Sequence, residues 1–312
     1  MKNTFYDLTM NWNDRETLIN PFLQDAPLFN TMPMMETNAK LANVTNKVKS
    51  ITTPQVIDFD APLPEIRTTF EKTYAVIGKV GGKISLGLDK IELLGEGLDA
   101  YIAAQMEPIM NQTGQDFDKS FIYNIIKAFC LKNDAKCVTR VLTGQTAETG
   151  YYSMVGISWR RGENCGLYNP DLSGAKLFKI IPMGNGGVIN IKNDKGEEIP
   201  GKQTIVQTYI GMQLPRPDRV HTLVNIKPDA ENGIPTPDQL LEFVSSFATG
   251  NPDTDVVYCH PTLINKIRAQ YMRDNQHADF IRQEGKDLLI DDVRVVKDPN
   301  MLKGLEAAVV DA

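Results

Sequence analysis

The chain has 312 residues, of which 42% are hydrophobic and 23% are charged, so it can bury a substantial core and is not a disordered tail or linker. Its 33 Lys and Arg against 39 Asp and Glu give a formal net charge of −6, which argues against a protein whose main task is to neutralise nucleic-acid phosphates. No apolar run is long enough to cross a bilayer, and the start lacks a signal-peptide core. We therefore expect a protein made in the cytoplasm, with no membrane partner.

Residues 1–36 are expected to form an irregular arm. Prolines interrupt it repeatedly, and its apolar residues follow neither a helical nor a two-residue period, so the segment cannot bury its own hydrophobic groups. We expect these groups to lie on another surface, and a subunit without residues 1–36 to stay folded. The candidate contact residues of the arm are Phe22, Leu23 and Phe29.

Residues 37–90 predict a long, isolated β-hairpin. Thr and Val are frequent in both limbs, alternation is clear over residues 84–88, and Pro62 and Pro64 mark the bend. A lone two-stranded hairpin is marginal in water, so we expect a neighbouring surface to cover it, with Phe70 and Tyr74 as candidate contacts. The alternative is two ordinary strands of a compact sheet.

An apolar stripe of helical period then predicts a long helix over residues 97–132, kinked or broken between Pro108 and Gly114. Further strands are predicted at residues 152–159, 177–182, 187–191, 205–212, 220–226, 256–259 and 288–296. Two helices lie among the last of them, one after Thr236 with a capping box to Gln239 and one from Pro261. The last third is therefore expected to form a small α/β unit.

Candidate chemistry is sparse, and we predict no catalytic, metal or cofactor site. The stretch at 184–187 lacks the Lys and Ser/Thr of a phosphate loop and is interpreted as a hairpin turn. His260 is expected to have a capping or surface role at a helix start, and Asp253 and Asp255 fit a strand-entry turn better than a calcium loop. The four cysteines contain no CxxC pair, so we expect buried, reduced thiols.

Trp159, Arg160 and Arg161 combine an aromatic ring with two cations. Two interpretations stay open for them. The three residues can stack on or pair with phosphate, or they can form a subunit contact, because Trp and Arg are enriched in interface hot spots.

The order of these parts resembles the major capsid proteins of tailed double-stranded DNA bacteriophages, which share the Hong Kong 97-type fold. Short motifs follow in the same order: Trp159 before the Gly-Leu-Tyr-Asn-Pro of 166–170, Tyr209 to Met212 before Arg219, a strand that ends in Asn225 and Ile226, and a late Glu306 before Val309. The chain departs from the family pattern in an extra Asn169 and in Met212, where Leu is usual.

The resemblance implies an α+β Hong Kong 97-type fold. Its parts would be an N-terminal arm (1–36), an extended E-loop hairpin (37–90), a peripheral domain with a spine helix (91–219), an axial domain (220–290) and a return strand (291–312). It also implies a structural protein without enzymatic activity, which assembles into the hexamers and pentamers of an icosahedral head shell around the phage DNA.

The implied partners are other copies of the chain, portal, scaffolding and decoration proteins, and loosely held DNA, and the implied location is the virion. Two alternatives remain. One is an encapsulin-like cargo compartment with the same fold, and the other is a two-domain α/β enzyme that binds a small molecule in the unit at 220–297.

Overall fold

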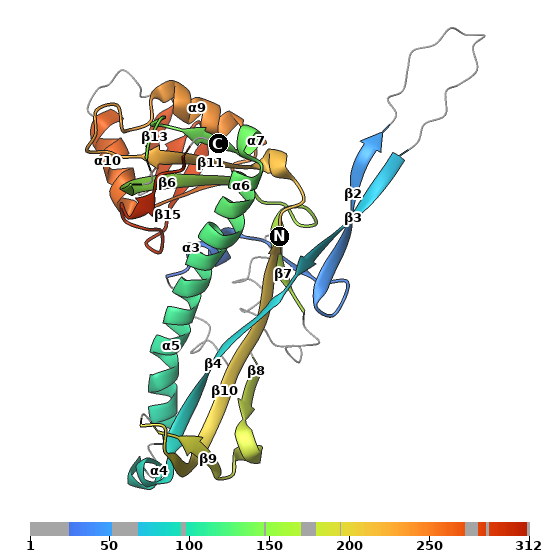
Figure 1. Cartoon of the computed structure of the whole chain (residues 1–312), viewed down its shortest axis with the longest axis vertical. Helices are drawn as coiled ribbons and strands as arrows, with labels where there is room; N and C mark the ends of the chain where they lie inside the picture. Colours follow the sequence, from blue (N-terminus) through green and yellow to red (C-terminus); the bar gives the residue numbers. More distant parts are fainter. Residues whose placement is uncertain are drawn as a thin grey trace, which may run out of the picture.

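The computed structural model describes residues 25–51, 68–94, 98–146, 148–169, 179–193, 195–271, 280–284 and 287–310. These residues form two lobes joined by a long helix, and a two-stranded ribbon projects away from the region where the lobes meet (Figure 1). We name these parts the upper lobe, the elongated lobe and the ribbon. No helix in the described ranges has both the length and the apolar character needed to span a bilayer.

The upper lobe is built on a sheet in the order β13-β14-β15-β12-β6-β11-β5, with β16 beside β6. Its strands are β5 (Val138–Arg140), β6 (Thr149–Ser158), β11 (Val220–Ile226), β12 (Asp255–Cys259), β13 (Ile281–Glu284), β14 (Asp287–Ile290), β15 (Val293–Lys297) and β16 (Glu306–Ala307). The predicted domain boundaries after 219 and 290 do not follow this sheet, because β5 and β6 precede the first and β15 follows the second. Long-range pairing decides which strands share a sheet, and local periodicity does not report it.

Both faces of this sheet are buried, as the alternation along β12 shows. Val257 and Cys259 belong to the core cluster under α9 (Pro237–Ser245) and α10 (Pro261–Tyr271). Val256 and Tyr258 point to the opposite face and join a second cluster. This second cluster includes residues of α3 (Pro27–Thr31) and of the long helix, so it ties the upper lobe to the rest of the chain.

The long helix is present, but its irregularity lies elsewhere than predicted. Helix α5 (Leu98–Ser120) passes through Pro108 and Gly114, and it continues as a π-helix, η2 (Phe121–Lys127), and α6 (Ala128–Lys132). Contact between α5 and β4 (Gly78–Gly87) supports the helix beside the proline, so tertiary packing outweighs the lost hydrogen bond. The short α7 (Asp134–Cys137) then leads into β5.

The elongated lobe is a narrow sheet beside α5 (Figure 1). Strands β1, β7, β10 and β4 are neighbours in that order, while β8 and β9 pair with successive parts of β10. The bounds are β1 (Met34–Glu36), β7 (Cys165–Tyr168), β8 (Lys179–Pro182), β9 (Ile189–Lys192) and β10 (Glu198–Gln213), and α4 (Leu88–Leu94) follows β4.

The Gly-rich stretch at 184–187 is not a hairpin turn. It overlaps a 3-10 turn, η3 (Met183–Gly186), which joins two strands that pair with β10 and not with each other. Gly184 and Gly186 have positive φ there, which is why glycine suits the turn.

The ribbon consists of β2 (Ala42–Ile51) and β3 (Thr68–Val76), which form an isolated antiparallel sheet. The predicted hairpin is thus present, but it ends at Val76. The second limb was predicted to extend through residues 84–88, which instead belong to β4 and the start of α4. The predicted bend at Pro62 and Pro64 lies outside the described residues.

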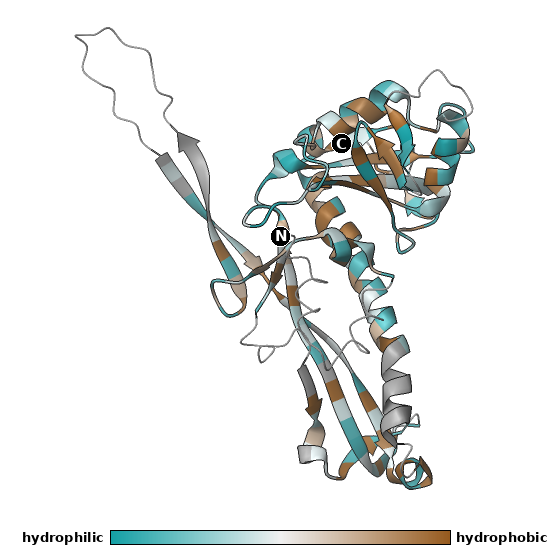
Figure 2. Cartoon of the chain, turned by 180° about the vertical axis from the view of Figure 1, so that it is seen from behind, coloured by the Kyte–Doolittle hydropathy of each residue, from teal (hydrophilic) through white to brown (hydrophobic). Residues whose placement is uncertain are grey.

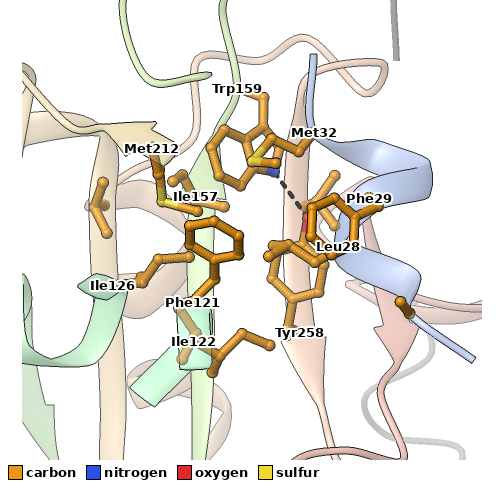
Figure 3. Packing of buried hydrophobic residues seen from close by; sticks show 14 of the residues in the cluster. Leu28, Phe29, Met32, Phe121, Ile122, Ile126, Ile157, Trp159, Met212 and Tyr258 are labelled. Atoms are coloured by element: carbon orange, nitrogen blue, oxygen red, sulfur yellow. Dashed lines mark hydrogen bonds between the residues drawn. The ribbon is translucent and has the colours of Figure 1, made fainter. Parts of the chain in front are cut away.

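The end of the predicted arm folds onto its own subunit. Residues 25–36, which we call the N-terminal segment, contain α3 and β1, and β1 pairs in parallel with β7. Leu28, Phe29 and Met32 are fully buried, and Figure 3 shows them directed toward the β-strands and the π-helix. The expectation that the arm leaves its own subunit is therefore wrong for this segment, because a single helical turn is enough to bury these side chains. Residues 1–24 lie outside the described residues.

The predicted strand at 288–296 is a hairpin of β14 and β15. Its two turn residues, Asp291 and Asp292, have φ of 46° and 65°. Two successive positive φ values are typical of the two-residue turns that match the twist of a hairpin. The capping box at Thr236 and Gln239 and the bounds of β11 agree with the prediction.

Candidate functional site

The part of the ribbon nearest the body presents an exposed apolar face. Tyr74 and Val76 are 66% and 68% exposed, and Leu41, just before β2, is 57% exposed. Alternate residues of a strand share a face, so Tyr74 and Val76 lie on one side together with their cross-strand partners Val44 and Ala42. We call this side the outer face of the ribbon. Figure 2 shows hydrophobic positions along this part of the ribbon.

The opposite, inner face fixes the ribbon to the body. Asn43 is buried, and its side-chain amide donates to Gln213 Oε1 at 2.5 Å. Gln213 in turn donates to the backbone oxygen of Glu163 at 2.8 Å. The Gln213 side chain therefore links Asn43 of the ribbon to the loop between β6 and β7. These hydrogen bonds fix the direction of the ribbon relative to β10 and that loop.

Gly211 on β10 allows the ribbon to meet the sheet closely. A Cβ atom at this position would lie 2.8 Å from the backbone oxygen of Val76 and 2.9 Å from Cα of Ile77. Such distances exclude a side chain unless the backbone moves. Ile77 N–H also donates to the Leu41 oxygen at 3.0 Å, which closes the base of the ribbon.

The other predicted contact residues fall into three groups. Phe29 and Trp159 are 0% and 1% exposed within the subunit, so they are core residues and their predicted role in subunit contacts is wrong. Arg160 and Arg161 are exposed in the turn after β6, where Arg160 lies 3.6 Å from Glu163 in a solvent-facing ion pair. Phe70 pairs with Val48 in the ribbon, but its side chain lies outside the described residues, as do Phe22 and Leu23 altogether.

Trp159 has a specific role in the core. Its indole N–H donates to the Tyr258 hydroxyl at 2.8 Å (Figure 3). That hydroxyl also contacts Thr31 Oγ1 of α3. Phe29 packs edge-on against Phe121, with ring centroids 5.8 Å apart. The N-terminal segment is thus joined to the sheet of the upper lobe by a polar contact and to the π-helix by an aromatic one.

The histidines and cysteines have structural environments. His260 Nδ1 accepts the N–H of Thr262 at 3.1 Å, as expected of a helix cap. His221 is buried and lies 2.9 Å from Thr139 Oγ1, and burial lowers its pKa. His277 lies outside the described residues. The four cysteines are free and buried, and burial raises the pKa of Cys130, so this thiol stays protonated.

Sequence reasoning missed a buried ion pair at the junction of the helix and the upper lobe. Lys127 of the π-helix pairs with Glu306 of β16, and both side chains are at most 10% exposed. Glu306 also accepts hydrogen bonds from Tyr123 at 2.7 Å and from Ser153 at 2.8 Å. The signal in the sequence was a lysine directly after the apolar Ile125 and Ile126.

Lys127→Met is expected to lower the free energy of unfolding by about 3–5 kcal/mol, because it leaves the Glu306 carboxylate buried without its cation. Urea unfolding of unassembled subunits measures this change. Adding Glu306→Gln removes the stranded charge and should restore at least half of the loss. A loss below about 1 kcal/mol for the single variant would show that the pair is hydrated and of little consequence.

A second buried polar cluster contains two carboxyl groups, Asp118 of α5 and Asp298 after β15, both 0% exposed. Asn300 joins them: its side-chain amide donates to Asp118 Oδ2 at 2.9 Å, and its backbone N–H donates to Asp298 Oδ1 at 2.8 Å. Burial, together with repulsion from Asp298, raises the pKa of Asp118 to about 8. Burial likewise raises the pKa of Asp298 to about 6.

The chain matches no protein-family model and no curated protein, but it resembles solved structures. A chain of bacteriophage epsilon15 aligns at a TM-score of 0.59 and 14% identity, over 89% of this chain and 88% of that one. The capsid of bacteriophage JBD30 aligns at a TM-score of 0.51 and 9% identity, over 88% and 90%. An encapsulin complex of Synechococcus elongatus aligns at a TM-score of 0.42 and 12% identity, over 64% and 86%.

The first two alignments cover nearly the whole of both chains, so they show a common fold. The predicted α+β fold of the Hong Kong 97-type is therefore confirmed. At these identities the similarity concerns the path of the chain and not individual residues.

Proposed function

We propose that this protein, with its Hong Kong 97-type fold, is the major capsid protein of a tailed phage and assembles into the hexamers and pentamers of an icosahedral head. Its role is structural and not enzymatic. Its main partner is a further copy of itself, and the shell encloses the double-stranded DNA genome. Synthesis and assembly take place in the host cytoplasm, and the finished location is the virion.

The observation that carries this proposal is the outer face of the ribbon. A two-stranded ribbon has too little core to be stable alone in water, and here the exposed side of its base, up to Lys72, is apolar. Its inner face is anchored through Asn43 and Gln213, whereas Tyr74 and Val76 on the outer face are left exposed by the part of the chain that the structure describes. A neighbouring copy that covers Tyr74 and Val76 supplies the missing core.

Contacts of this kind are heterologous, since the ribbon of one copy meets a different surface of the next. Heterologous contacts close into rings when the rotation between copies permits, which is how hexamers and pentamers arise. A stable contact in such a ring should bury on the order of 1,200 to 2,000 Å² or more. The shared fold with the JBD30 capsid supports this arrangement.

The charge of the chain is consistent with a container for DNA. A net charge of −6 disfavours tight, phosphate-driven binding, so packaged DNA can slide along the wall. The portal, scaffolding and decoration proteins of such a head are further partners in this proposal.

Negative-stain electron microscopy of the purified protein, with analysis of its contents, tests the proposal. We expect uniform closed particles, with phage DNA in those isolated from infected cells. Particles that contain a single enzyme and no nucleic acid would favour the encapsulin-like alternative. A monodisperse monomer at all concentrations, together with turnover of a small molecule, would overturn the shell and favour the enzyme.

A further inference from the structure

The buried carboxyl pair, Asp118 and Asp298, lies where three parts of the chain meet: α5, the turn after β15 and the N-terminal segment. Each carboxyl group has one oxygen with no hydrogen-bond partner among the described residues, Asp118 Oδ1 and Asp298 Oδ2. A buried carboxylate with an unsatisfied oxygen is unfavourable when charged and far less so when protonated. The pair is therefore built to hold a proton.

The N-terminal segment covers this pair and is fastened to it. The backbone N–H of Leu28 faces the Asp118 carboxyl group and partly offsets the rise in its pKa. The side-chain amide of Asn300 donates both to Asp118 and, at 2.6 Å, to the backbone oxygen of Asp25. Movement of this segment away from α5 would open a route for water to Asp118.

Among the residues that the structure describes, the groups that face the pair supply no compensating cation. They are Thr31 of α3, Tyr258 of β12, Tyr123 of η2, and Asp25, whose own carboxylate accepts from Asn111 and Gln115. Beyond Tyr123 lies Lys127, but Glu306 already neutralises it. Full ionisation of the pair would thus place two negative charges in the core that no cation of the described residues balances.

We propose that Asp118 and Asp298 form a protonation-dependent latch, which keeps the N-terminal segment docked on its own subunit while the pair retains a proton and releases the segment when both carboxyl groups ionise. The latch belongs to the single subunit and does not depend on the proposed capsid function. Release would free the apolar residues Leu28, Phe29 and Met32 for other contacts.

The pH window follows from the direction of the two shifts. Both pKa values are raised above the ordinary 3.8, so the docked state is favoured at low pH and loses this stabilisation as the pH rises through about 6 and then about 8. Between these values the docked state holds about one proton more than the open state. Linkage then gives about a tenfold increase in opening per pH unit.

Hydrogen exchange of unassembled, full-length subunits between pH 5 and 9 tests the latch. Protection factors corrected for intrinsic exchange are compared for the amides of Phe29 and Met32, which donate within the segment, and for amides of β11. In the wild type, protection of the segment should fall about tenfold per pH unit from pH 6 to 8, while β11 stays protected. If the amides of β11 lose protection over the same pH range, the whole subunit unfolds, and this result would overturn the latch.

Asp118→Asn is expected to abolish this pH dependence. Asp116→Asn, an exposed carboxyl on the same helix, is the matched control and should behave as the wild type. If Asp118→Asn fails to fold, Asp298→Asn serves instead, and it should move the transition to lower pH because Asp118 loses the repulsion. The proposal would be overturned if protection of the segment fell with pH in the tested variant as steeply as in the wild type. It would also be overturned if protection in the wild type did not depend on pH.

Discussion

Phe29→Ala is expected to lower the free energy of unfolding of the subunit by about 3–5 kcal/mol. The ring is fully buried and packs between Phe117 and Phe121, with centroids 6.2 and 5.8 Å away, so its removal leaves a cavity at the junction of the lobes. Urea unfolding of unassembled subunits measures the change. The sequence pattern alone predicts almost no effect, because it assigns Phe29 to an arm that is dispensable for folding.

Tyr74→Ala is the control for this experiment, since an exposed tyrosine of the ribbon should change the stability of the subunit by no more than about 0.5 kcal/mol. A deletion that stops before Asp25 and one that continues to Glu36 extend the comparison. The longer deletion removes α3 and β1 and should yield an unstable subunit. If Phe29→Ala costs less than about 1 kcal/mol, the N-terminal segment does not lie on its own core in solution.

Tyr74→Asp is expected to block assembly while it leaves the subunit folded. A buried tyrosine contributes about 1.5–3 kcal/mol, and an aspartate would bring an unpaired charge into the same contact. Because each 1.4 kcal/mol corresponds to about a factor of ten, the concentration required for assembly should rise at least about a hundredfold. Light scattering over a concentration series measures assembly, and urea unfolding of the subunit should change by no more than about 0.5 kcal/mol.

Tyr74→Phe is the matched variant here, since it keeps the ring and removes only the hydroxyl group, and it should assemble like the wild type. Two results would contradict the role of the outer face. One is normal assembly of Tyr74→Asp. The other is a large loss of subunit stability, which would place Tyr74 in the core of the subunit despite its 66% exposure.

The elements that sequence predicted well are those with local signals. The capping box from Thr236 to Gln239 fixes the start of α9 within four residues, and β11 is a mostly apolar and β-branched run, VHTLVNI, bounded by Arg219 and Lys227. The ribbon was predicted from its frequent Thr and Val and from the prolines that mark a bend. The end of the ribbon at Val76 was not predicted, because β3 and β4 are separated only by the pairing of β4 with the distant β10.

For the candidate contact residues, the sequence could not distinguish a subunit contact from a core position. Trp159 and Phe29 are large and apolar, and that chemistry suits a subunit contact and a core equally well. Trp159 is a core residue because it packs against Tyr258 on β12 and Met32 just after α3. Both neighbours are far from Trp159 in the sequence, so the sequence does not reveal these contacts. Asp118 gave a detectable signal, because it precedes Phe121 and Ile122 by one helical turn and so lies on the apolar side of α5.

A cryo-EM reconstruction of assembled particles tests the central claim most directly, because it shows what covers the outer face of the ribbon. We expect Tyr74 and Val76, exposed in the subunit, to be buried against a neighbouring copy in every hexamer and pentamer. Closed particles in which both side chains remain in solvent would contradict it.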